Sequence, residues 1–156
     1  MEADETTAGL DRMALKRQAA TYHDQGYNCA QAVICALAPA LDIDAGAAFR
    51  LAEGFGAGMG GMSETCGAIS GAVMAAGQAV SDGPANPTTK GRTYKLSREI
   101  AGRFRKGNGS TICRELKGIG REGGPLRSCA GCIDDAIDIA VDVLSAADAN
   151  QSAAAR

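Results

Sequence analysis

Four cysteines in the chain each follow closely after a residue that commonly begins a helix. They are Cys29 after Asn28, Cys66 after Ser63, Cys113 after Ser110 and Cys129 after Ser128. Asn and Ser are favoured N-cap residues, and the start of a helix carries a positive partial charge. This setting stabilises the thiolate, which is the form of cysteine that attacks disulfides and binds metals. The spacing therefore predicts redox or metal chemistry.

The two remaining cysteines differ in their surroundings. Cys132 forms a Cys-x-x-Cys motif with Cys129, which is typical of a dithiol couple or of half a zinc site. A second pair of this kind would indicate a closed zinc site, and the sequence has none. Cys35 lies on another side of the same predicted helix as Cys29, beside Val33 and Ile34. We expect Cys35 to lie in the core, apart from the other cysteines.

A glycine-rich segment precedes Cys66, with five glycines in residues 54–61. Successive backbone amides in such a segment can bind an anion or the sulfur atoms of a cluster. The spacing does not match a dinucleotide fingerprint or a P-loop, so we exclude nucleotide binding. Gly67 and Gly71 share one face of the next predicted helix, which indicates close approach of another backbone or of a cofactor. The candidate cofactor contacts are Gly56, Gly58, Gly60 and Gly67.

Composition limits the fold and the partners. The 156 residues are 46% hydrophobic but only 4% aromatic, which favours a single domain of tightly packed helices with a core of Ala, Leu, Ile and Val. A net charge of -2 gives no electrostatic signal for nucleic acid. The most apolar stretch, 66–80, is shorter than the roughly 20 residues that a membrane span needs.

The acidic N-terminus lacks the features of a secretory signal, so we expect a cytoplasmic protein. In that reducing compartment, six cysteines favour metal binding or redox cycling over a static set of disulfides. The expected partner is a redox protein or a small-molecule thiol or disulfide. The oligomeric state is not indicated.

Hydrophobic periodicity predicts an all-α bundle of about seven helices, several of them short, with the glycine-rich loop next to the cysteines. We expect helices over 11–26, 28–38, 44–53, 63–80, from Thr88 or Thr89 onward, 110–117 and 129–147. In the fourth of these, Ser63 is the expected N-cap and Cys66 the third helical residue. Residues 1–10 and 149–156 are expected to be flexible, leaving 11–148 as the domain. We interpret the acidic face of the last helix as solvated rather than as a metal site; it carries Asp134, Asp135, Asp138 and Asp142.

Several segments together resemble a known family. They are the stretches 26–33, 54–60, 64–71 and 113–116 and the late Cys129. In order and spacing they are similar to the C-GCAxxG-C-C family of redox-active proteins, from about Tyr22 to Val141. The resemblance implies a small helical domain, a redox role without an established substrate, and a gene often found near those of transporters.

The resemblance also implies four signature cysteines, matching Cys29, Cys66, Cys113 and Cys129. A similar domain occurs in split-Soret cytochromes, where it is associated with an iron-sulfur centre. This chain has no Cys-x-x-Cys-His motif, so haem is not carried over. Because the chain adds Cys132 to the pattern, the fourth functional thiol is either Cys129 or Cys132.

Three hypotheses follow for the function. In the first, the four signature cysteines bind an iron-sulfur cluster of the two-iron type for electron transfer or redox sensing. In the second, the protein is a cofactor-free thiol-disulfide oxidoreductase in which Cys66 is the attacking thiol. In the third, it is a structural zinc protein or a transporter-associated scaffold. The first two require the sulfurs of Cys29, Cys66, Cys113 and either Cys129 or Cys132 to meet at one end of the bundle.

Overall fold

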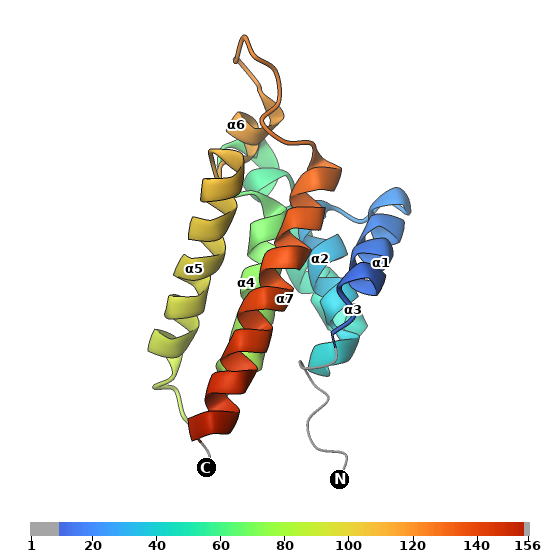
Figure 1. Ribbon diagram of the computed structural model, residues 1–156. Coiled ribbons are helices and arrows are strands. Elements are labelled where there is room, and N and C mark those ends of the chain that lie inside the picture. Colours follow the sequence, from blue (N-terminus) through green and yellow to red (C-terminus); the bar gives the residue numbers. More distant parts are fainter. Residues whose placement is uncertain (1–9, 155–156) are drawn as a thin grey trace.

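The computed structural model describes residues 10–154, which form a bundle of seven α-helices without strands (Figure 1). The helices are α1 (Arg12–Asp24), α2 (Cys29–Leu37), α3 (Ala45–Ala52), α4 (Gly67–Val80), α5 (Lys90–Asn108), α6 (Cys113–Lys117) and α7 (Cys129–Ala154). Three short turns lie between them: η1 (Pro39–Leu41), η2 (Glu53–Phe55) and η3 (Gly58–Met62). The predicted all-α fold is confirmed. The segment 1–10, predicted to be flexible, lies outside the described residues except for Leu10.

Helix α4 lies at the centre of the bundle and contacts α2, α5 and α7. Helices α4 and α7 both begin at the end of the bundle where α6 lies, while α5 runs in the opposite direction (Figure 1). A Cβ atom added at Gly71 would lie 2.8 Å from the carbonyl oxygen of Ala30, and one at Gly67 would lie 2.9 Å from that of Phe55. Both glycines therefore allow backbone segments to approach α4 closely, which explains their position within a helix.

Side-chain caps fix the starts of α2 and α3, and the sequence predicts the first of them, Asn28. The Asn28 side chain accepts a hydrogen bond from the Gln31 amide at 3.0 Å, and the Gln31 side chain accepts one from the Asn28 amide at 3.0 Å. This reciprocal capping box fixes the first turn of α2. The Asp44 carboxylate accepts from the Ala47 amide at 2.8 Å at the start of α3.

The predicted start of the fourth helix is wrong. Helix α4 begins at Gly67, and Cys66 is its N-cap rather than its third residue, so Ser63 does not cap it. The reason is a contact with a distant segment: Thr65 forms an antiparallel bridge with Ile112. This bridge holds the backbone extended up to Cys66 and delays the helix by one turn.

Two other helix boundaries also differ from the prediction. Helix α6 begins at Cys113, because the Ser110 hydroxyl accepts from the Ile112 amide at 3.0 Å and turns the chain before the helix starts. Helix α7 continues to Ala154, so residues 149–154, predicted as a flexible tail, are helical. Within the described residues, no helix combines the length and the apolar character that crossing a membrane requires.

The glycine-rich segment is a pair of tight turns rather than an open loop. Its second turn, η3, begins after Ala57, which has a φ of 50°. Gly58 and Gly60 have φ values of 53° and 84°, and Met59 between them has a φ of 65°. A left-handed conformation is unfavourable for Ala and Met, so this backbone is strained next to the cysteines.

Candidate functional site

Five of the six cysteines line one cavity of about 190 Å³ at the end of the bundle where α6 lies. Four helices contribute them, each from its start. Helices α2, α4 and α6 contribute one cysteine each and α7 contributes two: Cys29, Cys66, Cys113, Cys129 and Cys132. The structure thus brings together all the cysteines for which a metal or redox role is predicted; the roles themselves remain predictions. Cys35 is buried in α2 and does not line this cavity.

Backbone hydrogen bonds bring Cys66 and Cys113 together. The Cys66 amide donates to the Thr111 carbonyl at 2.8 Å, and the Cys113 amide donates to the Glu64 carbonyl at 2.9 Å. These two bonds flank the bridge between Thr65 and Ile112. The starts of α4 and α6 are therefore joined by main-chain contacts that do not depend on the side chains of the cysteines.

The other cysteines are positioned by side-chain caps. Asn28 caps α2 and also donates from its side-chain amide to the Glu53 carbonyl at 2.8 Å, which connects Cys29 to the glycine-rich segment. Ser128 accepts from the Gly131 amide at 3.0 Å at the start of α7, next to Cys129. Because Asn28 and Ser128 are N-caps in the sequence prediction, these two positions follow from local sequence.

Three of the four candidate cofactor glycines pack tightly against other residues of the protein. A Cβ atom at Gly56 would lie 2.4 Å from the Asn28 side chain, and one at Gly58 would lie 2.4 Å from the Cβ of Cys113. Gly67 approaches Phe55, whereas Gly60 has open space around it. Close packing accounts for Gly56, Gly58 and Gly67, and their predicted contact with a cofactor stays a prediction.

Cys66 and Cys132 interact directly within the cavity. The Cys132 thiol donates a hydrogen bond to the Cys66 sulfur, which lowers the pKa of Cys66 to about 7 and raises that of Cys132. Burial opposes this shift at Cys66, and the backbone amides of Ala68 and Ile69 in the first turn of α4 support it. Cys66 is therefore the thiol of this pair that ionises at neutral pH, as its place at a helix start predicts.

The other thiols of the cavity hold their protons more strongly. Burial raises the pKa of Cys29 to about 12, with further contributions from neighbouring Cys129 and Cys66. Burial also raises the pKa of Cys113. Cys66, Cys113 and Cys132 are buried, while Cys29 and Cys129 are half-buried.

Three basic side chains line the same cavity, and sequence reasoning missed them: Lys117, Arg127 and His23. The charge of Lys117 favours the thiolate at both Cys66 and Cys113: it contributes to the lowered pKa of Cys66 and opposes the rise that burial causes in the pKa of Cys113. Lys117 stands four residues after Cys113 in α6, so helical spacing places both on one face. That spacing was the available signal for Lys117. His23 is six residues before Cys29 and Arg127 is two residues before Cys129, so closeness in the chain was the available signal for both.

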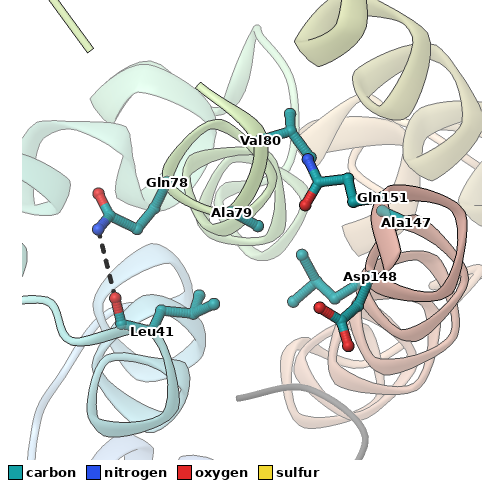
Figure 2. A pocket seen from close by; sticks show the side chains of 8 residues that line it. Leu41, Gln78, Ala79, Val80, Ala147, Asp148 and Gln151 are labelled. Atoms are coloured by element: carbon teal, nitrogen blue, oxygen red, sulfur yellow. Dashed lines mark hydrogen bonds between the residues drawn. The ribbon is translucent and has the colours of Figure 1, made fainter. Parts of the chain in front are cut away.

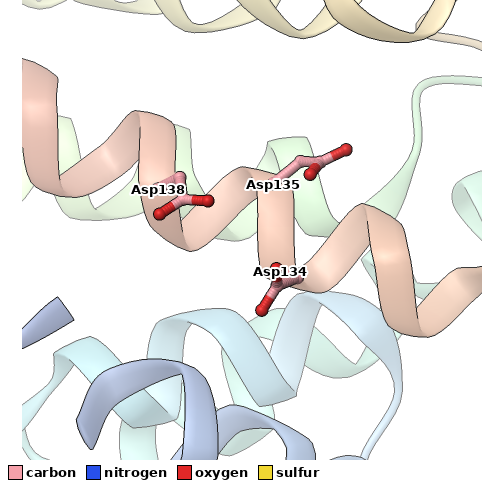
Figure 3. A group of neighbouring side chains, drawn as sticks. All are labelled: Asp134, Asp135 and Asp138. Carbon is pink, nitrogen blue, oxygen red and sulfur yellow. The ribbon is translucent and has the colours of Figure 1, made fainter. Parts of the chain in front are cut away.

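Figure 3 shows three aspartates of the acidic face of α7: Asp134, Asp135 and Asp138. One carboxylate oxygen from each of Asp134, Asp135 and Asp138 lies within 4.8 Å of the others. Lys16 pairs with Asp134 at 3.2 Å and with Asp138 at 2.6 Å, and Arg127 pairs with Asp135 at 3.0 Å. Ion pairs thus engage each of these three carboxylates, and their interpretation as a solvated face rather than a metal site stays a prediction.

A second cavity, of about 230 Å³, lies at the opposite end of α4 and α7 (Figure 2). Its lining includes Val80 and Ala147, and Gln78 at its edge donates to the Leu41 carbonyl at 3.3 Å. The lining contains neither cysteine nor histidine. Five of the six cysteines therefore line the cavity beside α6, and none lines this second cavity.

Comparison with known proteins identifies a family. The family model described as "Putative redox-active protein (C_GCAxxG_C_C)" matches residues 27–143, which include all six cysteines. The resemblance seen in the sequence is therefore confirmed. No curated protein and no solved structure gives a significant match to the chain.

Proposed function

We propose, from the premise that this chain belongs to the C_GCAxxG_C_C family of redox-active proteins, that its cavity binds an iron-sulfur cluster for electron transfer or redox sensing. The observation that carries the proposal is the meeting of five thiols in one cavity. Iron-sulfur clusters of the two-iron and four-iron types are held by four cysteine thiolates. When bound, such a cluster supplies one-electron transfer.

The donor set in the cavity fits this group. Cys29, Cys66 and Cys113 would provide three thiolates, and either Cys129 or Cys132 the fourth. The positive ends of α2, α4 and α7 converge here, so their first amides offset negative charge at the centre. The lining also includes Lys117, which has the same effect.

Binding must displace protons from these thiols. Because the pKa of Cys29 is about 12, its proton leaves at neutral pH only when a metal takes its place. We therefore expect the affinity for metal to rise with pH. The expected location is the cytoplasm, and the expected partner is a redox protein or a small-molecule thiol or disulfide.

Anaerobic reconstitution of the reduced protein with iron and sulfide tests the proposal. Visible absorbance, an EPR signal after reduction, and stoichiometric iron and sulfide are expected. The variant Cys35→Ser removes a cysteine outside the cavity and is expected to bind the cluster, whereas the double variant C29S/C66S is expected to remain colourless. A wild-type protein that takes up no iron, or that holds only zinc, would overturn the proposal.

A second candidate function, thiol-disulfide exchange, is favoured by the contact between Cys66 and Cys132. The first has a pKa of about 7 and the second is its hydrogen-bond donor, an arrangement that suits an attacking thiol and a resolving thiol. Treatment of metal-free protein with a disulfide, followed by peptide mass spectrometry, is expected to give a bond between Cys66 and Cys132. A product confined to other cysteines would exclude this pair.

A further inference from the structure

In the part of the chain that the structure describes, the cavity that the five cysteines line contains basic side chains but no acidic ones. Its lining includes Lys117, Arg127 and His23, and none of the described residues that line it is Asp or Glu. The whole chain carries 18 acidic and 16 basic residues, so this lining does not reflect the composition. A cavity with basic but no acidic side chains in its lining favours anionic reactants.

Lys117 is distinguished from Arg127 by its ion pairing. The Arg127 guanidinium donates two hydrogen bonds to Asp135, each of 3.0 Å, so its charge is largely compensated. Within residues 10–154, no carboxylate forms an ion pair with Lys117. The positive charge available to a reactant in the cavity is therefore mainly that of Lys117.

The backbone around Lys117 is firmly held. Helix α6 ends at Gly118, which has a φ of 76°, and a Cβ atom there would lie 2.3 Å from the carbonyl carbon of Gly124. The amides of Leu126 and Arg127 both donate to the Leu116 carbonyl, at 2.8 and 3.2 Å. The returning loop thus fixes the end of α6, and Lys117 with it, at the edge of the cavity.

We propose that the cavity selects small anionic disulfides and that Lys117 is the residue that determines this preference. The inference rests on the second proposed function, thiol-disulfide exchange. In the reaction, a thiolate of the cavity attacks one sulfur of the disulfide, and a mixed disulfide forms as the original sulfur-sulfur bond breaks. The other half of the reactant leaves as a thiolate, which takes a proton from water. Lys117 attracts the carboxylate of the reactant and does not react itself.

Three alkyl disulfides of similar length provide the test: 3,3′-dithiodipropionate is a dianion, bis(2-hydroxyethyl) disulfide is neutral, and cystamine is a dication. The rate of mixed-disulfide formation is measured by mass spectrometry on reduced, metal-free protein. We expect the dianion to react fastest and its advantage to diminish at high salt. The ratio of the anionic to the neutral rate is the readout, because a general loss of thiolate would slow both reactions equally.

Substitutions at Lys117 identify the determinant. Lys117→Gln is expected to lower the anionic-to-neutral ratio roughly three- to tenfold, the scale of one charge acting at short range in a partly solvated site. Lys117→Glu should favour cystamine, and Lys117→Arg should keep the wild-type order. Lys95→Gln makes the same charge change on exposed α5, away from the cavity, and should leave the ratio unchanged.

The outcomes distinguish the role of Lys117 from the thiol-disulfide exchange function on which it rests. A ratio that is the same in Lys117→Gln and in the wild type, with both reagents reacting, overturns the role of Lys117 and leaves thiol exchange standing. Failure of all three disulfides to modify the wild-type cavity overturns the exchange function and the inference together. Circular dichroism and thermal unfolding verify that each variant is folded.

Discussion

Cys66 combines three features that rarely coincide in one buried residue. It is the N-cap of α4, it accepts a hydrogen bond from Cys132, and only 5% of it is exposed. Burial alone would keep the thiol protonated, as it does at Cys35. The donors around Cys66 therefore decide its ionisation, and the Cys132 thiol is the one that a side-chain substitution removes.

We predict that the alkylation rate of Cys66 by neutral iodoacetamide, in reduced metal-free protein, follows a titration with a midpoint near pH 7. Cys132→Ala removes the hydrogen-bond donor, so the midpoint should rise toward the value of a free thiol, about 8.5. Cys132→Ser keeps a donor and should keep the low midpoint. Peptide mass spectrometry over pH measures these rates. An unchanged midpoint in Cys132→Ala would mean that the α4 amides and the charge of Lys117 set the pKa without Cys132.

Gly58 is a second position where one residue controls the site. Its φ is +53°, and an added Cβ atom would lie 2.4 Å from that of Cys113 and 2.8 Å from the Glu64 carbonyl oxygen. We predict that Gly58→Ala lowers the free energy of unfolding by roughly 3 kcal/mol or more, through backbone strain and a steric clash together.

The matched control is Gly60→Ala, at a φ of +84° with open space around it. This variant has the backbone strain without the clash, so its free energy of unfolding should fall by only about 1–2 kcal/mol. Urea unfolding measures both. Equal losses in the two variants would show that the contact with Cys113 relaxes without cost.

At the level of helices and turns, two N-caps allow the effect of a cap on stability to be distinguished from its effect on the cysteine site. Asn28 caps α2, which carries Cys29, and Asp44 caps α3, which carries no cysteine. We predict that Asn28→Ala and Asp44→Ala each lower the free energy of unfolding by about 1 kcal/mol. Only Asn28→Ala should also reduce the iron incorporated on reconstitution, because only α2 positions a thiol. Equal iron uptake by both variants would contradict this link between the cap and the site.

The same helices show which helix starts can be predicted from the sequence and which cannot. The starts of α2 and α3 depend on side chains within one turn of the helix, so the local pattern identifies them. The start of α4 depends on the pairing of Thr65 with Ile112, which are far apart in the chain, and no local signal indicates that pairing. The caps Asn28 and Ser128 place Cys29 and Cys129 as predicted, whereas this pairing, and not the predicted caps Ser63 and Ser110, positions Cys66 and Cys113.

At the scale of the whole molecule, ion pairs hold α1 against α7. Asp138 interacts with both Arg12 and Lys16, at 3.0 and 2.6 Å. Burial raises the pKa of Asp138, but the hydrogen bonds from Lys16 and Arg12 outweigh it, so the net shift is downward from 3.8. A carboxyl group with a lowered pKa stabilises the fold above its unfolded pKa and loses that contribution as pH falls through its folded value.

We therefore predict that Asp138→Asn is less stable than the wild type at pH 6 and that the difference shrinks as the pH falls below about 3.8. Thermal unfolding across pH 2–7 measures the difference. Asp148→Asn changes an aspartate of the same helix that makes no ion pair within residues 10–154, and its difference from the wild type should stay small throughout. A difference for Asp138→Asn that persists at pH 3 would mean that packing, not charge, is lost.

If the proposed iron-sulfur cluster binds here, five thiols surround a centre that takes four ligands, and one thiol is in excess. If Cys129 or Cys132 is lost, the other remains one turn away on α7, within the same cavity. A survey that replaces cysteines one at a time would then find both positions dispensable and would misjudge α7 as irrelevant to the chemistry. Only their joint replacement would expose the dependence, so the cavity tolerates a mutation, or the oxidation of one sulfur, that a four-cysteine site would not survive.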